Sequence, residues 1–489
     1  MSTPTASSLG NTGLIVLLAG LLLPGIDFSI VNVALGDLAR TLHADETALE
    51  LMTAAYGLAF AVCLALGGRI GDNFGRRAVF RLGVLLFGLA SLGCGLAPSV
   101  AVMLTARAAQ GFAAALLVPQ ILATIHVCLR GRAHAHAIGL YGSIGGIAFI
   151  VGQVLGGALI SADIAGLGWR NVFLVNLPIC LLILAASARS IPETRRVGTS
   201  HFDLRGTMLL TLLLLCLLLP LALGPAHHWA LPYPLLPIVA LPLARGLWTG
   251  SDRLERAGGL PLLPPSLLRL GSVRFGLLIA ALFFSSWSGF MFIMAVALQT
   301  GAGLSPAASG RVFMPLGLAY FVAALLSTRI VARIGRAAAL IFGCAVQMLG
   351  LVAVIITLRQ VWPHPDMQTL APALSLVGAG QALIVSSFFR IGLSDVPAEQ
   401  AGAGSSVLST VHQAALGLGS AVLGAVYCLA LPDGGRLVAL DAGIEAELAL
   451  MALLVIAAWR WSRRGSGRHD EQVCPARLKV ETATENSPL

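Results

Sequence analysis

Residues 67–80 read GGRIGDNFGRRAVF and form a short charged segment between two long apolar runs. The runs cover residues 48–68 and 78–97, and each matches the length of about 20 apolar residues that a helix needs to cross a bilayer. A connection this short places the two helices side by side in opposite directions. The segment therefore predicts a helical hairpin embedded in a membrane.

The composition of the whole chain agrees with a membrane protein. Of its 489 residues, 57% are hydrophobic and 11% are charged, whereas soluble domains carry about 45–50% apolar and about 25% charged residues. The net charge of +9 does not indicate a nucleic-acid partner. The arginines lie in short loops between apolar runs, where they fix the orientation of membrane proteins.

Fourteen apolar runs are candidates for membrane-spanning helices. The first run has no basic segment or cleavage site before it, so we expect a retained helix rather than a signal peptide. We predict an all-α integral membrane fold with spans at 13–36, 48–68, 78–97, 101–124, 137–160, 170–189, 206–223, 232–248, 274–298, 310–331, 338–358, 369–390, 404–430 and 445–461.

The basic residues test this count, because cytoplasmic loops of membrane proteins are enriched in Lys and Arg. With a cytoplasmic N-terminus and fourteen crossings, 25 of the 31 Lys and Arg residues fall on the inner side. Arg107 lies within a span, and the remaining five arginines face outward. We therefore predict a multi-pass protein of the cell (inner) membrane with both termini in the cytoplasm.

An internal repeat divides the chain into two halves. RIGDNFGRR at 69–77 and RIVARIGRA at 329–337 share four residues at a constant offset, each in a predicted cytoplasmic loop, and transporters are often built from repeated halves. The predicted units are a cytoplasmic N-terminus (1–12), an N-terminal six-helix bundle (13–189), two inserted peripheral helices (206–248), a cytoplasmic linker (249–273), a C-terminal six-helix bundle (274–461) and a disordered cytoplasmic tail (462–489).

The chain lacks the motifs of cofactor, metal and nucleotide sites. Its eight cysteines show no C-x-x-C spacing and are interpreted as small buried hydrophobes. Its one lysine, Lys479, lies in the tail, so a Walker-type loop is excluded. Acidic, histidine and serine residues do not cluster with catalytic spacing. We expect a carrier without cofactor or bound metal, not an enzyme, an ATP-driven pump or a channel.

Two charged residues lie deep in predicted spans. Asp27 is the one acidic residue in the middle of an apolar span, and Arg107 is the one basic residue at such depth. A charge at a helix centre costs about 2.5–3.5 kcal/mol on insertion scales, so it usually marks a functional site. Both residues are expected about 10–14 Å below the outer surface. A buried carboxyl that is neutral in one state and ionised in another suits proton coupling.

Several segments resemble one known family, the major facilitator superfamily, in its fourteen-helix drug:proton antiporter branch. The resemblance covers residues 10–460. It rests on GGRIGDNFGRRAVF (67–80), DFSIVNVAL (27–35), RAAQGFAAA (107–115), WRNVFLVNLPIC (169–180) and IPETRR (191–196). It implies two six-helix bundles with a pseudo-twofold relation, two extra helices, and proton-coupled export of small amphipathic compounds by alternating access.

The resemblance implies roles for the deep charges and for the charged loop. Asp27 would couple protons, touching Arg107 directly or through Gln110; a static buried ion pair is the alternative. The loop would be a conformational latch centred on Asp72, while topogenic charge is the alternative and is favoured for Arg77. The loop residues in their expected places are Gly68, Asp72, Gly75, Arg76 and Arg77.

Two segments depart from the family's pattern. The antiporter motif of the fifth helix is Gly152, Gln153, Gly156 and Gly157 here, with Gln153 where a proline is usual. The thirteenth helix carries His412 instead of an arginine. Polar residues in or at the end of C-terminal spans either line a substrate path or make single interhelical hydrogen bonds. They are Gln299, Gln347, Gln381, His412 and Gln413.

The expected partners are a small-molecule substrate, protons and the lipid bilayer. Import of a nutrient or metabolite by proton symport is the alternative function, and the direction of transport in vesicles separates the two. The sequence does not indicate which compound is carried. Each pair of half-bundles is complete without another subunit, so a monomer is compatible with the pattern.

Overall fold

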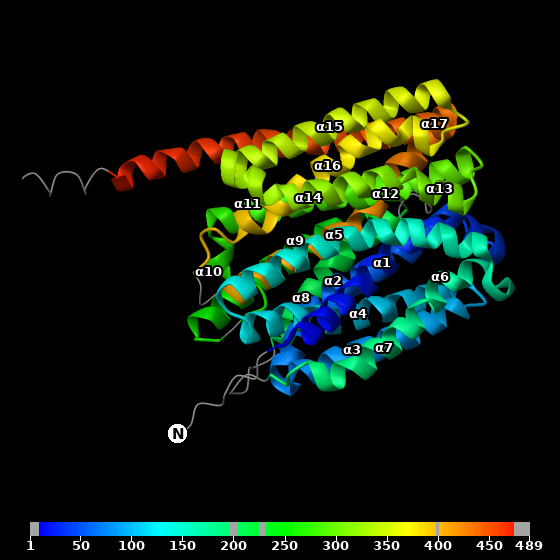
Figure 1. Ribbon diagram of the computed structural model, residues 1–489. Coiled ribbons are helices and arrows are strands. Elements are labelled where there is room, and N and C mark those ends of the chain that lie inside the picture. Colours follow the sequence, from blue (N-terminus) through cyan, green and yellow to red (C-terminus); the bar gives the residue numbers. More distant parts are fainter. Residues whose placement is uncertain (1–8, 195–202, 224–229, 260, 398–400, 474–489) are drawn as a thin grey trace, which may run out of the picture.

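The computed structural model describes residues 9–194, 203–223, 230–259, 261–397 and 401–473. Within these ranges the chain forms helices joined by turns and short connections, with no strand. The predicted all-helical fold is confirmed. Helices from the first part of the chain form one side of the molecule and helices from the last part form the other (Figure 1).

The first side is built from helices that pack as a bundle. In it α2 lies along α4, α3 packs between α4 and α7, and α1 packs on α5. The elements are α1 (Asn11–Leu42), α2 (Glu46–Phe74), α3 (Arg76–Gly95), α4 (Val100–Cys128), α5 (Gly131–Ala162), η1 (Ile164–Gly166), η2 (Gly168–Arg170), α6 (Asn171–Leu174) and α7 (Asn176–Ser190).

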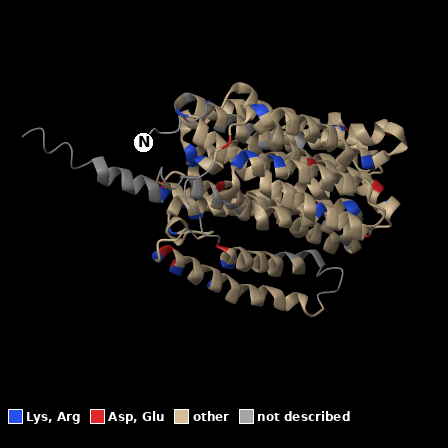
Figure 2. Ribbon diagram, turned by 90° about the horizontal axis from the view of Figure 1, so that it is seen from below, with Lys and Arg blue, Asp and Glu red and all other residues tan. Residues whose placement is uncertain are grey.

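Two further helices follow, α8 (Leu204–Leu223) and α9 (Leu236–Arg256), with the short η3 (Tyr233–Leu235) between them. They pack on each other, and α8 also contacts α2 and α17. Leucine side chains of both helices are exposed, among them Leu212 and Leu241. Charged residues are sparse along α8, and those of α9 lie mostly in its last two turns (Figure 2). Exposed leucines suit a lipid-facing position at the periphery of the fold.

The second side contains the remaining helices. Here α14 and α15 pack on α16, and α12 packs on α17. The elements are α10 (Pro265–Leu268), α11 (Gly271–Ile279), η4 (Ala280–Phe284), α12 (Ser285–Val296), η5 (Ala297–Gly301), α13 (Pro306–Val312), α14 (Met314–Ile334), α15 (Arg336–Val361), α16 (Met367–Gly392) and α17 (Ala401–Val473).

Local chemistry sets two of these boundaries. Asp366 begins α16 through a capping box with Thr369, and hydrogen bonds from Thr369 lower the pKa of the Asp366 carboxyl below its ordinary value. Gly435, with a φ of 77°, divides α17 into two helices, because a positive φ is accessible to glycine at little cost. The second helix, Gly434–Arg463, is a separate candidate span.

All fourteen predicted spans fall on helices. Among the described residues, ten helices are long and apolar enough to cross a membrane, or eleven if the bent pair in α2 is counted as one span. The chain is thus a multi-pass membrane protein, and the count of fourteen stays a prediction. The start of α1 and the end of α17 lie at the same end of the molecule (Figure 1).

Some boundaries differ from the predicted ones. The last span begins at Gly434 rather than at 445, and α17 continues to Val473, past the predicted end at 461. In the predicted linker, α9 extends to Arg256 and α10 forms a further turn. The expectations for the first eight residues and for 474–489 lie outside the described residues.

Candidate functional site

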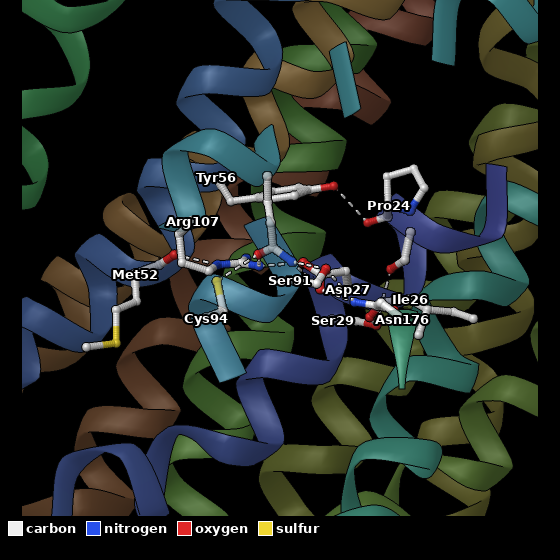
Figure 3. A network of polar contacts seen from close by, with 12 residues as sticks. Pro24, Ile26, Asp27, Ser29, Met52, Tyr56, Ser91, Cys94, Arg107 and Asn176 are labelled. Atoms are coloured by element: carbon white, nitrogen blue, oxygen red, sulfur yellow. Dashed lines mark hydrogen bonds and ion pairs between the residues drawn. The ribbon is translucent and has the colours of Figure 1, made fainter. Parts of the chain in front are cut away.

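Asp27 lies at the centre of a buried polar network in the N-terminal bundle (Figure 3). Its Oδ2 accepts a hydrogen bond from Arg107 Nη1 at 2.5 Å. Its Oδ1 accepts from Gln110 Nε2 at 3.0 Å and from Asn176 Nδ2 at 2.8 Å. Asp27 and Arg107 are both fully buried. Three donors around two carboxylate oxygens are arranged for the ionised form of Asp27.

Ser91 connects the neutral members of this network. Its Oγ accepts from Gln110 Nε2 at 2.8 Å and from Asn176 Nδ2 at 3.2 Å. Since Ser91 lies on α3, the network joins α1, α3, α4 and α7. A change in the charge of Asp27 would therefore alter hydrogen bonds that connect four helices.

Arg107 is held by more than its carboxylate partner. Its Nε donates to Met52 O at 3.1 Å on α2, and its guanidinium lies 4.5 Å from the centre of the Tyr56 ring. Its Nη1 also donates to Gln110 Oε1 at 2.9 Å, while Nη2 has no hydrogen-bond partner among the described residues. These contacts fix the guanidinium beside Asp27, and a cation over an aromatic face adds further attraction.

Proline and glycine shape the turn of α1 that carries Asp27. Pro24 lies inside α1, and the Tyr56 hydroxyl donates to its carbonyl oxygen at 3.1 Å. On the other side, a Cβ added to Gly152 of α5 would lie 2.0 Å from Ser29 Oγ. Helix α5 can therefore approach α1 this closely only without a side chain at position 152.

The fifth-helix motif lies against both halves of the molecule. A Cβ on Gly156 would lie 2.8 Å from Ile30 of α1, and one on Gly157 would lie 2.7 Å from Pro306 O of α13. Gln153 is fully buried, and its two amide atoms have no hydrogen-bond partner among the described residues. Its backbone oxygen lies beside Gly310. The motif thus links the Asp27 turn to the C-terminal half.

The charged loop packs on its own half. Asp72 Oδ1 accepts from Arg76 Nη2 at 2.6 Å, and Arg77 Nε lies 3.5 Å from Glu193 Oε2, just beyond α7. Gly75 has a φ of 100°, and Gly68 packs on the Pro119 side chain of α4. Within the described contacts, the Asp72 carboxylate binds a residue of the same loop. The role of this loop as a conformational latch stays a prediction.

The polar residues predicted in the C-terminal half have separate partners. The Gln299 amide lies 3.4 Å from Asn32 O of α1 and bridges the two halves. The His412 ring lies 3.9 Å, centre to centre, from the Phe284 ring, and Gln413 beside it in the chain is half-buried. Gln381 is fully buried and both its amide atoms lack hydrogen-bond partners among the described residues.

Gln347 reveals a residue that the sequence analysis missed. Its Nε2 donates to Glu447 Oε1 at 2.8 Å, and both side chains are fully buried. The prediction that Asp27 is the one deep acid is therefore wrong. The predicted last span began at 445 and placed Glu447 at its end, whereas the helix begins at Gly434. Asn176 and Ser91 were also given no role, because neutral polar residues in apolar runs carry a weak signal.

An apolar cavity lies between the two halves on the side of α5 and α14. Its volume is about 490 Å³, which is within the range of about 300–1,000 Å³ typical of sites for drug-sized ligands. Exposed side chains such as Val151 and Phe321 contribute to its walls. A compound entering here would meet almost only hydrocarbon.

Comparisons with known proteins agree with this architecture. A family model described as Major Facilitator Superfamily matches residues 17–420. A "Probable actinorhodin transporter" of Streptomyces coelicolor is 32% identical, over 81% of this chain and 69% of that protein. A "Puromycin resistance protein pur8" of Streptomyces alboniger is 34% identical, over 82% of this chain and 78% of that protein.

Two further matches extend these findings. A "Multidrug resistance protein Stp" of Mycobacterium tuberculosis is 31% identical, over 82% of this chain and 73% of that protein. The crystal structure of the human organic anion transporter MFSD10 (TETRAN) superposes with a TM-score of 0.62, covering 92% of this chain and 100% of that chain at 18% identity. The structural match concerns the fold.

Proposed function

The chain belongs to the major facilitator superfamily, whose members are carriers rather than enzymes, and we propose that it exports small amphipathic compounds of the antibiotic class in exchange for protons. The names of its relatives, with 31–34% identity, support this class of substrate. The observation that carries proton coupling is the carboxylate of Asp27, fully buried and paired with Arg107.

The energy of the buried pair is large enough to drive a conformational change. Removing one charge of such a pair costs about 3–5 kcal/mol, because the other charge is left buried and uncompensated. About 5.5 kcal/mol moves a two-state equilibrium from 1:99 to 99:1. A proton that neutralises Asp27 would therefore supply most of what a full switch between two states requires.

The packing of α5 provides a route from the proton site to the substrate path. Gly152 and Gly156 of α5 contact the Asp27 turn of α1, while Gly157 contacts α13 of the other half. If protonation moves α1, α5 must follow, and the interface between the halves changes with it. This is the coupling that alternating access by rocking halves needs.

The proposed substrate class is supported by the charge of the Asp27 network and by the apolar cavity between the two halves. Asp27 and Arg107 neutralise each other, so the network presents no net charge. The cavity between α5 and α14 is apolar and suits a compound that partitions into lipid before it is carried. We further propose, from the arginine asymmetry, that both termini are cytoplasmic, and that the transporter works as a monomer without a cofactor.

A susceptibility assay tests the proposal. A drug-sensitive bacterium would express the wild type, Asp27→Asn or Asp37→Asn, and be exposed to puromycin, lincomycin and dyes such as ethidium, with and without a protonophore. Asp37 is the matched control, since it lies on the same helix but in a surface pair with Arg40. The wild type and Asp37→Asn should raise the inhibitory concentration of at least one compound.

Protection should disappear in Asp27→Asn and in the presence of the protonophore. Full protection by Asp27→Asn at equal expression would remove Asp27 from the coupling mechanism. A wild type that protects against no compound of the panel would contradict the substrate class.

A further inference from the structure

Glu447 is buried near the middle of a membrane-spanning helix. It lies on the helix Gly434–Arg463, about 20 Å along the axis from the start of that helix, and is fully buried. An ionisable residue at such a position is expensive unless it is neutral, paired or used. The hydrogen bonds and charges around Glu447 show which of these three cases applies.

Among the described residues, the hydrogen-bond partner of Glu447 is an amide. Gln347 Nε2, on α15, donates to Glu447 Oε1 at 2.8 Å. The other oxygen of each group, Glu447 Oε2 and Gln347 Oε1, is buried without a hydrogen-bond partner among the described residues. Two acceptors thus remain unsatisfied within one pair of side chains, and a proton on the carboxyl group would supply the donor that neither of them has.

The charges of the surrounding helices do not neutralise Glu447. In the described part of the chain it forms no ion pair, and α12 carries no charged residue. On the helix itself and on α11, α15 and α16, which pack on α17, the charged or titratable residues are Arg274 on α11, Arg336, Cys344 and Arg359 on α15, Arg390 on α16, and Arg436, Asp441, Glu445, Arg460 and Arg463 on the helix.

The nearest of these cations are already engaged or distant. Arg359 lies about 18 Å from Gln347 along α15, and its Nε pairs with Asp441 Oδ2 at 2.7 Å. Arg336 lies about 16 Å away in the other direction, and its Nη1 donates to Arg390 O at 3.2 Å. An ionised Glu447 would therefore be a buried charge stabilised by one amide alone.

A single proton resolves every unsatisfied atom of the pair. On Glu447 Oε2 it becomes a donor, and Gln347 Oε1 is the acceptor that lacks one. The protonated acid would then donate to the amide that already donates to it at 2.8 Å, and the buried charge would disappear. Burial favours this neutral form, because a polar group away from water is tolerated only when its hydrogen bonds are made.

We propose that Glu447 is a second proton-binding site of the transporter, which holds its proton against Gln347 in the conformation described here and releases it in another. The inference rests on the proton-coupled export proposed above and adds a site in the C-terminal bundle. Asp27 is arranged as a carboxylate in the same conformation, so the two bundles hold their acids in opposite protonation states.

A route for the released proton lies on the same helix. Asp441 precedes Glu447 by about 9 Å along the axis, and its Oδ1 is buried without a hydrogen-bond partner among the described residues. The proton would leave Glu447 Oε2 and pass Asp441 to water at the end where Arg359 is exposed. Release leaves an ionised Glu447, which Gln347 alone cannot stabilise, so the helices must rearrange with it.

Infrared spectroscopy of the purified full-length protein in a detergent without ester groups tests the site without any substrate. A protonated carboxylic acid gives a carbonyl stretching band that a carboxylate and an amide lack. At neutral pH the wild type should show such a band, and Glu447→Gln should lose it. Asp27→Asn and Glu445→Gln should keep it. Glu445 is the matched control, two residues away on the same helix and exposed.

Two further measurements test the hydrogen bond to Gln347 and the release of the proton. Gln347→Leu removes the amide acceptor and should shift the band to the frequency of an acid without that hydrogen bond. Raising the pH should abolish the band reversibly while circular dichroism shows an intact fold. A wild-type spectrum identical to that of Glu447→Gln would overturn the site. If the band persists at every pH at which the protein is folded, Glu447 never releases its proton and is a structural group, which would contradict the proposal.

The result of the infrared experiment does not depend on the result of the export assay. The spectra report the proton on Glu447 whether or not any compound is carried, so a transporter with another substrate would still show the band. Conversely, loss of export in Asp27→Asn with no band from Glu447 would retain the proposed function and remove the second site.

Discussion

Asp27 on α1 and Arg107 on α4 are 80 positions apart in the chain and form a 2.5 Å ion pair that is completely buried. Gln110 contacts both members of the pair, donating to one and accepting from the other. A buried pair of this kind contributes little net stability compared with apolar packing, but breaking it by removing one partner is costly. The pair therefore adds little as a purely structural contact. It is well suited to a switch that a proton operates.

The pair should behave as a unit in a double-mutant cycle. Asp27→Asn or Arg107→Gln alone should lower the free energy of unfolding by about 3–5 kcal/mol, because each leaves one buried charge. The double variant is neutral and should be closer to the wild type than either single variant. Thermal unfolding of the purified proteins measures this. Additive losses in the double variant would show that the two side chains are not coupled.

Asn176 should matter because it supplies one of three donors to Asp27. Asn176→Ala should lower the free energy of unfolding by about 1.5–3 kcal/mol, the usual contribution of a hydrogen bond to a charged group, and should reduce export. Asn171→Ala is the control, since Asn171 is also buried but donates to Ile164 O. Equal losses of export in the two variants would argue against a special role for Asn176.

Gly152 should tolerate no side chain. A Cβ there would lie 2.0 Å from Ser29 Oγ and 2.5 Å from Ile26 O, so Gly152→Ala should displace α5 from α1 at a cost of about 1–3 kcal/mol and impair export. In contrast, Gly250→Ala on α9 should have little effect, because a Cβ there meets nothing within 4 Å. Normal export and stability in Gly152→Ala would contradict the tight packing of α5 on α1.

A substitution of Asp72 can distinguish a role in the transport cycle from the effect of an ordinary surface ion pair. Asp72→Asn should change stability by less than about 1 kcal/mol, as for other partly exposed pairs, yet lower export several-fold. Asp252→Asn is the matched control, because Asp252 and Arg256 form a pair of the same spacing and 2.6 Å length outside the loop. If both variants export normally in vesicles, the loop charges only orient the chain.

Much of the fold could be predicted because the bilayer imposes a simple rule on sequence. Every span must be long and apolar, so the helices could be found from runs such as 338–358, which lies within α15. The same rule made Asp27 and Arg107 conspicuous, since a charge in an apolar run stands out. Their contact could be anticipated because both lie at similar depth.

Neutral polar residues and span boundaries could not be predicted in this way. Asn176 carries no charge, and its contact with Asp27 depends on how α7 packs, which no periodicity reveals. Glu447 was missed because Arg436 and Asp441 lower the hydropathy of the first turns of its helix. In the structure Arg359 of α15 neutralises Asp441, so these turns belong to the helix and carry Glu447 into its middle.

Proton movement in proteoliposomes tests the central claim most directly. Vesicles containing the wild type, Asp27→Asn or Asp37→Asn and a trapped pH indicator would receive an outward-directed gradient of an exported compound identified in the susceptibility panel. Wild type and Asp37→Asn should move protons against the flow of the compound, and Asp27→Asn should not. Compound-driven proton movement that persists undiminished in Asp27→Asn would contradict the account.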